Sequence, residues 1–246
     1  MTWLLLVLAG IGAGLVGAVT GLASLVSYPA LLAVGLPPLT ANVTNSIAMV
    51  GTTIGAAAGS RPELTGQRDQ VLKLCAITAA GGIGGAVLLL VTPPGTFTLV
   101  VPWLIGAASV LLLFAPRLRA LATRSDGVGL GPLTGLAAFA VAVYCGYFGA
   151  AAGVLMLALL SVIWAQSLAR SNAAKNLATG AANLIAAVLF TFTGKVDWPA
   201  ALALCAGSII GAWLGPALVR RLPAAPLRIV IAIAGLGLAV SLAARS

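Results

Sequence analysis

The chain has 246 residues, of which 61% are hydrophobic and only 7% are charged, and its mean hydropathy is +1.14. A soluble domain carries about 25% charged residues, so this composition excludes a water-soluble globular protein. The net charge of +9 comes from short polar stretches between apolar segments, which is the pattern of the positive-inside rule and not of a nucleic-acid-binding surface. The sequence therefore predicts an all-α, polytopic bundle of transmembrane helices in the lipid bilayer, with no nucleic-acid partner.

Apolar runs divide the chain into about ten segments. Their approximate bounds are 3–18, 21–36, 40–59, 71–92, 97–115, 130–148, 149–166, 171–193, 198–219 and 226–243. A helix that spans the membrane needs roughly 20 apolar residues. The third, fourth, eighth and ninth meet that length well. The first two segments are short and almost continuous, and so are the sixth and seventh. Each of these pairs is either two short helices that meet at a glycine break or a re-entrant hairpin.

The two halves of the chain resemble each other. The matches, each separated by 128 to 132 positions, are Gly17 with Gly149, Gly21 with Gly153, Asn45 with Asn176, and TGQRD at 65–69 with TGKVD at 193–197. An ordered series at near-constant spacing indicates an internal duplication. We expect a first transmembrane repeat over 1–115, a cytoplasmic linker over 116–129 and a second transmembrane repeat over 130–246.

Basic residues gather at the connections after the third, fifth, seventh and ninth segments. If these connections are cytoplasmic, the TGQRD loop lies inside and the TGKVD loop outside, so the repeats have inverted topology and both termini are periplasmic. Inverted repeats are typical of secondary transporters, whose substrate site lies near the bilayer midplane between the repeats.

Two glycine-broken stretches, 14–45 and 146–176, occupy matching places in the two halves. A broken membrane helix exposes backbone N–H groups, and its positive dipole end attracts an anionic substrate. Close packing of small residues is the alternative explanation for the glycines.

Polar side chains follow each break. On a helix, Asn172, Lys175 and Asn176 share one face, where an ammonium and two amides would cradle an anion. Ionisable groups inside a membrane are costly, so they are taken as functional by default. The alternative explanations are that Lys175 extends to the membrane interface and that the asparagine amides only join helices. Thr20 and Ser24 are weaker candidates. The predicted substrate-binding residues are Lys175, Asn176, Asn172, Asn45, Thr44, Gly17, Gly21, Gly149, Gly153 and Tyr147.

The residues that are missing also narrow the function. The sequence has no histidine, and its four carboxylates lie in the linker or at segment ends. A buried proton relay or a metal site is therefore not expected. The chain has no P-loop, no HExxH motif and no nucleophile paired with a general base, so we expect neither an enzyme nor a cofactor.

The opening GIGAGLVGAVTGLASLVSYPALLAVGLPP, the following TANVTNSIAMVGTTIGAAAG and the second-half SNAAKNLATGAANLIAAVLFTFTGKVDW resemble the TauE/SafE sulfite-exporter family over nearly the whole chain. The resemblance implies transport of small sulfur-containing anions such as sulfite, sulfoacetate and other organosulfonates. It places Gly17, Gly21, Asn45, Gly149, Gly153 and Asn176 at the family's repeated glycine and asparagine positions. This chain has GLASLVSYP and Ala150–Ala152 where members often have more glycines, so its substrate could differ.

The expected function is transport of a small sulfur-containing anion, sulfite or an organosulfonate, across the bacterial inner membrane by alternating access, with export favoured. The alternatives are an uptake permease for another small solute and a non-transport membrane assembly or scaffold subunit. The exact anion, the direction, the coupling ion and the oligomeric state stay open, with a homodimer as one option.

Overall fold

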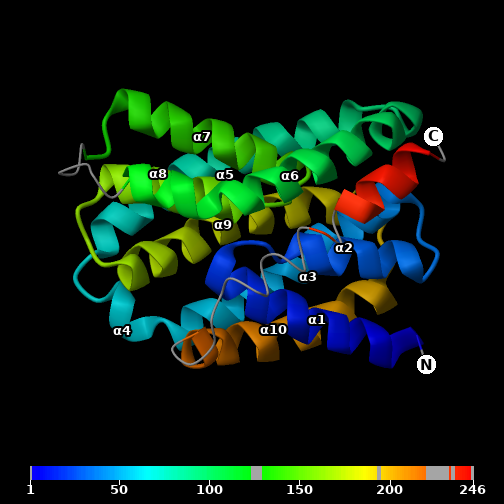
Figure 1. The fold of residues 1–246 in the computed structure, drawn as a ribbon, viewed down its shortest axis with the longest axis horizontal. Helices are drawn as coiled ribbons and strands as arrows, with labels where there is room; N and C mark the ends of the chain where they lie inside the picture. The colour runs from blue at the N-terminus through cyan, green and yellow to red at the C-terminus, as the bar shows by residue number, and fades with distance from the viewer. Residues whose placement is uncertain (1, 123–128, 193–194, 220–232, 234–235, 245–246) are drawn as a thin grey trace.

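The computed structural model describes residues 2–122, 129–192, 195–219, 233 and 236–244, and within these ranges every regular element is a helix (Figure 1). The helices are α1 (Thr2–Thr20), α2 (Ser24–Ala33), α3 (Pro38–Gly59), α4 (Arg61–Leu64), α5 (Arg68–Val91), α6 (Pro94–Ala122), α7 (Pro132–Tyr147), α8 (Ala152–Ile163), α9 (Leu168–Thr191) and α10 (Trp198–Val219). Residues 236–243 form a further helical stretch. The predicted all-α bundle is confirmed.

Helix lengths agree with the apolar runs in most places. The short helix α4 was not predicted, α6 continues into the expected linker, and most of the expected tenth segment lies outside the described residues. Five of the described helices are long and apolar enough to cross a membrane: α1, α5, α9, residues 94–111 of α6 and residues 198–215 of α10. Helix α3 has 22 residues, but the buried Asn, Thr and Ser side chains along it lower its hydropathy.

Helices α2 and α8 are too short to span a bilayer. They have 10 and 12 residues, or about 15 and 18 Å at 1.5 Å per residue, roughly half of the hydrocarbon thickness. Helix α2 folds back on α1, because Gly17 lies against Ala23 and Gly12 lies near Val26. Helix α8 folds back along α7, since the Gly129 N–H donates to the Ile163 carbonyl at 2.9 Å. The pairs α1–α2 and α7–α8 are therefore both helical hairpins.

The two hairpins enter the bundle from opposite ends (Figure 1). Helix α1 runs parallel to α10, and α7 runs parallel to α5, as shown by Gly10 against Leu204, Gly14 against Ser208, Gly81 against Phe139 and Gly85 against Val143. Helix α10 also packs on α3, and α5 also packs on α9. Helix α10 of the second half therefore packs on the first hairpin, and α5 of the first half packs on the second hairpin.

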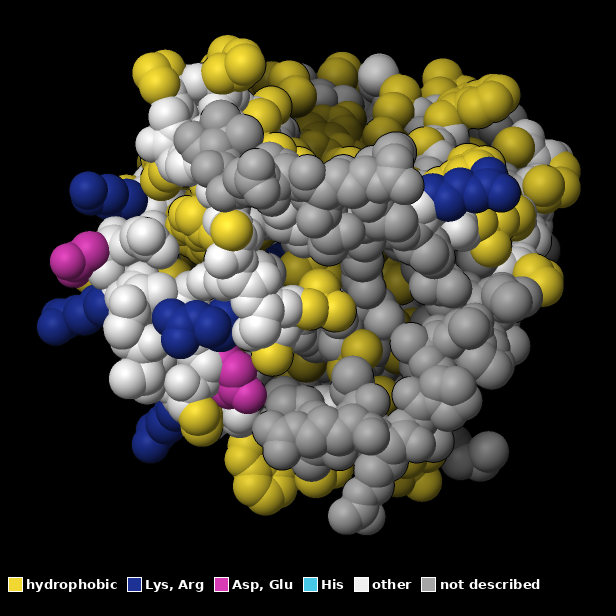
Figure 2. Space-filling model, turned by 60° about the vertical axis from the view of Figure 1, so that its left-hand side comes forward, with side chains coloured by type: hydrophobic (Ala, Val, Ile, Leu, Met, Phe, Trp, Pro, Cys, Tyr) yellow, Lys and Arg dark blue, Asp and Glu magenta, His cyan; other side chains and the backbone are white. Residues whose placement is uncertain are grey.

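One end of the bundle carries most of the described basic side chains, on the left in Figure 2. Arg61 and Arg68 flank the connection through α4, which packs on the start of α9 near Arg170. Lys73 lies beside the start of α7. We call this the basic end, and the charge pattern predicts that it faces the cytoplasm.

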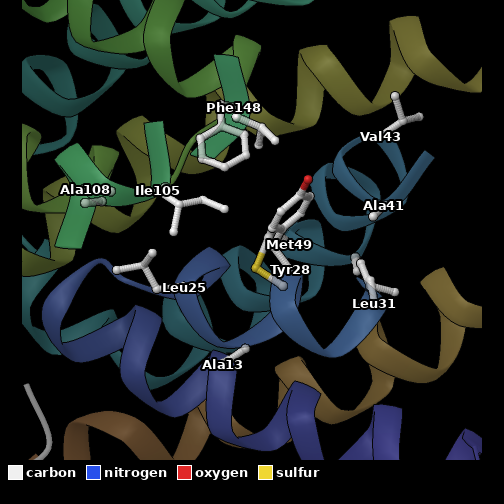
Figure 3. Packing of buried hydrophobic residues seen from close by; sticks show 14 of the residues in the cluster. Ala13, Leu25, Tyr28, Leu31, Ala41, Val43, Met49, Ile105, Ala108 and Phe148 are labelled. Carbon is white, nitrogen blue, oxygen red and sulfur yellow. The ribbon is translucent and has the colours of Figure 1, made fainter. Parts of the chain in front are cut away.

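The largest apolar cluster lies between the hairpins and the opposite end. Tyr28 of α2 meets the Phe148 ring edge-on, with ring centroids 5.4 Å apart, and Phe97 of α6 lies 6.2 Å from Phe148. Figure 3 shows Phe148, Tyr28 and Met49 gathered in this core. Aromatic pairs at such distances add packing energy beyond the burial of their area, so the tips of the hairpins are held in a well-packed environment.

Candidate functional site

The two glycine breaks of the sequence are the tips of the two hairpins, and the tips touch each other. Gly21 has φ +81, and a Cβ added to it would lie 2.6 Å from Gly153 Cα; a Cβ added to Gly153 would lie 2.5 Å from Gly21 Cα. No real side chain fits at such distances. Glycine at both positions thus lets the backbones of the two halves meet in the middle of the bundle.

A cavity of about 50 Å³ lies at this contact. Its lining residues are Gly17, Gly21, Ala23, Ser24, Met49, Thr52, Thr53, Cys145, Gly149, Ala152, Gly153, Asn176, Thr179 and Asn183. Because one water molecule needs about 10–15 Å³ of such space, the cavity accommodates roughly three to five oxygen-sized atoms. The structure thus brings together the four predicted glycines and Asn176 around one small space.

Two helix N-termini open onto the cavity. Ala23 and Ser24 belong to the start of α2, and Ala152 and Gly153 belong to the start of α8, and all four line it. The first N–H groups of a helix have no intrahelical acceptor, and the helix dipole makes this end positive. The two halves of the chain therefore each contribute one positive helix end to the same space.

The predicted polar face of α9 exists, but it contacts the end of α1. Lys175 Nζ donates to the Gly17 carbonyl at 3.2 Å, and the side-chain amides of Asn172 and Asn176 donate to the Ala18 carbonyl at 2.8 and 3.1 Å. Both carbonyls belong to the last turn of α1, the negative end of that helix. Lys175 is fully buried, so the ammonium and the two amides cap α1.

The matching residues on α3 make different contacts. The Asn42 amide donates to the Tyr147 carbonyl at the end of α7, at 2.9 Å, which is the counterpart of the cap on α1. Thr44 Oγ1 accepts the Asp197 N–H at 3.1 Å. Asn45 bonds to α2 through Ser24 and Ser27. The predicted residues Asn45, Thr44, Tyr147, Asn172 and Lys175 are therefore not among the described residues that line the cavity.

The groups around this cavity favour a negatively charged ligand. The described residues that line the cavity include amides, hydroxyls and a thiol but no carboxylate. The caps from α9 and α3 occupy carbonyls at the negative ends of α1 and α7, while the N-termini of α2 and α8 face the cavity. Within the described ranges, no three His, Cys, Asp or Glu side chains are placed to hold a metal ion. The arrangement suits a small ligand rich in hydrogen-bond acceptors.

Sequence reasoning missed several lining residues. Thr52 and Thr53 lie about two helical turns after Asn45, Thr179 and Asn183 lie about one and two turns after Asn176, and none of the four belongs to a motif. A pattern was nevertheless present, since these residues follow Asn45 and Asn176 at helical spacing and so continue the polar face of α3 and α9. Polar side chains repeated along one face of a membrane helix mark the face that turns away from lipid.

A multi-pass helical bundle in which the tips of two helical hairpins meet at a cavity between the halves of the chain is the architecture of a membrane transporter. The family model "Sulfite exporter TauE/SafE" matches residues 6–242. The chain belongs to this family, which confirms the resemblance that the sequence motifs indicate.

Curated relatives carry consistent names. The "Probable membrane transporter protein YfcA" of Escherichia coli K12 is 29% identical over 208 residues, covering 84% of this chain and 77% of the relative. A "Probable membrane transporter protein" of Haemophilus influenzae is 27% identical over 217 residues, covering 85% and 82%. One from Sinorhizobium, ORF9, is 24% identical over 239 residues, covering 94% and 88%. No solved structure matches the chain. The protein is thus a multi-pass membrane transporter of this family.

Proposed function

We propose that the protein is a secondary transporter that moves a small sulfur-containing oxyanion, sulfite or an organosulfonate, out of the bacterial cell across the inner membrane. The observation that carries this proposal is the cavity at the hairpin tips, where two helix N-termini meet hydroxyl and amide groups and no carboxylate of the described chain lines the space. Oriented N–H groups at helix ends bind sulfate- and phosphate-like anions in many proteins. A volume of three to five oxygen-sized atoms suits a sulfur centre with its oxygens.

Lys175 supports the choice of an anion. Its ammonium is buried beside the cavity lining, because it donates to Gly17 and its neighbour Asn176 lines the space. A buried positive charge lowers the cost of bringing an anion into a medium of low dielectric constant. In this mechanism Lys175 acts through space and through α1, and the hydroxyls, amides and backbone N–H groups make the direct contacts.

The proposed mechanism is alternating access between two inverted repeats. The opposite directions of α1 and α7 support it, as does the meeting of the two hairpins at a single point. Rocking of one hairpin relative to the other would open the cavity first to the basic end, in the cytoplasm, and then to the periplasmic end, where both chain termini would lie. An inside-negative potential favours anion exit by about 2.3 kcal/mol per charge per 100 mV, so export needs no proton relay.

The test is sulfite efflux from proteoliposomes that contain the purified protein. We expect efflux that rises when the interior is made electrically negative and that is absent from protein-free liposomes. A screen of thermal stability against sulfite, sulfate, thiosulfate, sulfoacetate and taurine would identify the preferred anion. Absence of both efflux and any anion-dependent stabilisation would overturn the proposal and favour an assembly or scaffold role; net uptake against the potential would favour a permease.

A further inference from the structure

Three side chains beside the first hairpin form a directed chain of hydrogen bonds that ends at the cavity. The Ser27 hydroxyl contacts Asn45 Oδ1 at short range and lies 3.1 Å from the Ala23 carbonyl, a second acceptor, and Asn45 Nδ2 donates to Ser24 Oγ at 3.1 Å. Ser27 and Asn45 are almost completely buried, and Ser24 is 9% exposed. Of these three residues, only Ser24 lines the cavity.

The direction of the chain determines what Ser24 offers to a ligand. A serine hydroxyl has one proton to donate and two lone pairs to accept with. Ser24 already accepts from Asn45, and among the residues that the structure describes none accepts the Ser24 proton. A buried hydroxyl normally donates to a partner, so the proton of Ser24 is available to the contents of the cavity.

The backbone reinforces this donor. Ser24 is the first residue of α2, so its side chain lies at the positive end of that helix. The N–H groups of Leu22 and Ala23, in the same hairpin tip, have no acceptor among the described backbone groups. A hydroxyl donor and unpaired N–H groups at one helix start form a site for a group that only accepts hydrogen bonds.

We propose that Ser24 binds the substrate directly by donating its hydroxyl proton to an oxygen of the oxyanion, and that Asn45 is the positioning residue that keeps the Ser24 proton directed into the cavity. This inference rests on the proposed anion transport. A site built to donate to an acceptor discriminates strongly against a ligand that cannot accept, because its buried donors are left unpaired.

Thr20 provides a matched control at the same hairpin. It is buried beside the same glycine break, but its hydroxyl donates to the Val16 carbonyl within α1 at 2.8 Å. Its proton is therefore already used. We expect Ser24→Ala to weaken sulfite binding to the purified protein by roughly tenfold to a hundredfold, the effect of losing one hydrogen bond to a charged group. We expect Thr20→Val to bind sulfite within about twofold of the wild type.

The role of Asn45 is tested by reversing the direction of the hydrogen bonds between Asn45 and Ser24. In Asn45→Asp, a carboxylate would accept from both Ser24 and Ser27, so the Ser24 proton would turn away from the cavity and sulfite binding would fall at least as far as in Ser24→Ala. In Ser24→Ala/Asn45→Ala, binding would be no weaker than in Ser24→Ala alone, because Asn45 acts through Ser24. A purely structural role for Asn45 would give additive losses together with lower thermal stability.

The outcomes separate the two proposals. Wild-type protein that neither binds nor transports any of the anions contradicts the proposed function. Wild-type protein that binds sulfite, with Ser24→Ala binding equally well at unchanged thermal stability, contradicts the role of Ser24 and leaves anion transport standing. Equal losses in Ser24→Ala and Thr20→Val would also contradict it, because they would show a general effect of altering the hairpin.

Discussion

Lys175 illustrates at the residue scale how a membrane protein keeps a buried charge. Its ammonium lies at the C-terminal turn of α1, where the helix dipole is negative and carbonyls lack intrahelical donors. The Gly17 carbonyl that it contacts also accepts the Gly21 N–H at 2.9 Å. Removing the ammonium would therefore leave that carbonyl paired. Lys175 should matter more for the potential at the cavity than for the stability of the fold.

Replacing this lysine by a neutral side chain of similar length tests that distinction. In Lys175→Met we expect a loss of stability of no more than about 1–2 kcal/mol, the size of a favourable charge–dipole contact. Sulfite efflux in proteoliposomes should fall at least tenfold, because one unit of positive charge beside the cavity is lost. Thermal unfolding and flux measured on the same preparation check both parts. Wild-type flux in Lys175→Met would show that its charge does not serve the anion.

Ala151 is strained. It has φ +61, in the left-handed region, and it precedes α8 in the tip of the second hairpin. For a residue with a Cβ this conformation costs roughly 1–2 kcal/mol relative to glycine. Because glycine is also more flexible in the unfolded chain, we expect Ala151→Gly to stabilise the protein by up to about 1 kcal/mol.

The neighbouring Ala150 is the control for this change. It is equally buried and is not among the described residues with positive φ. Ala150→Gly should therefore lower thermal stability, since it adds flexibility to the unfolded chain without relieving strain. If both substitutions shift the unfolding temperature in the same direction, strain at Ala151 is not the cause.

At the scale of the elements, contact between the hairpin tips depends on Gly21 and Gly153. We expect Gly153→Ala to destabilise the protein by about 3 kcal/mol or more, because a methyl group 2.5 Å from the Gly21 Cα forces the two backbones apart. Gly95→Ala, in α6, is the control, since no atom of the described residues lies within 4 Å of its added Cβ. Size-exclusion profiles and thermal unfolding of both variants in detergent would measure the difference.

The elements were largely predictable from the sequence, because apolar length and Pro/Gly punctuation are local properties. The cavity was predictable in part, since the duplicated glycines marked the backbone contact of the two hairpins. The partners of the polar side chains were not predictable. Lys175 and Asn172 were expected to face an anion, but they donate to carbonyls of α1, more than 150 positions away in the sequence. Such contacts follow from how helices of the two halves pack, which periodicity along one helix does not encode.

At the scale of the whole molecule, packing does not follow the expected boundary between 1–115 and 130–246. Helix α10 of the second half packs on α1 and α3, and α5 of the first half packs on α7 and α9. Each hairpin is thus supported by a helix from the other half. A movement of one hairpin would be transmitted to both halves of the chain, which is what alternating access around one central cavity needs.

Because the helices of the two halves run in opposite directions, we expect their matching loops to lie on opposite sides of the membrane. Thr65, which is exposed at the basic end, and Lys195, which is exposed at the opposite end, lie in the two matching TGxxD loops. After replacement of Cys75, Cys145 and Cys205, single cysteines at these positions should react from opposite sides of the membrane. A thiol reagent that cannot cross the inner membrane should label Lys195→Cys in intact cells, whereas Thr65→Cys should be labelled only after the membrane is opened. Labelling of both in intact cells would contradict the inverted arrangement, and labelling of Thr65→Cys alone would keep the inversion but reverse the orientation in the membrane.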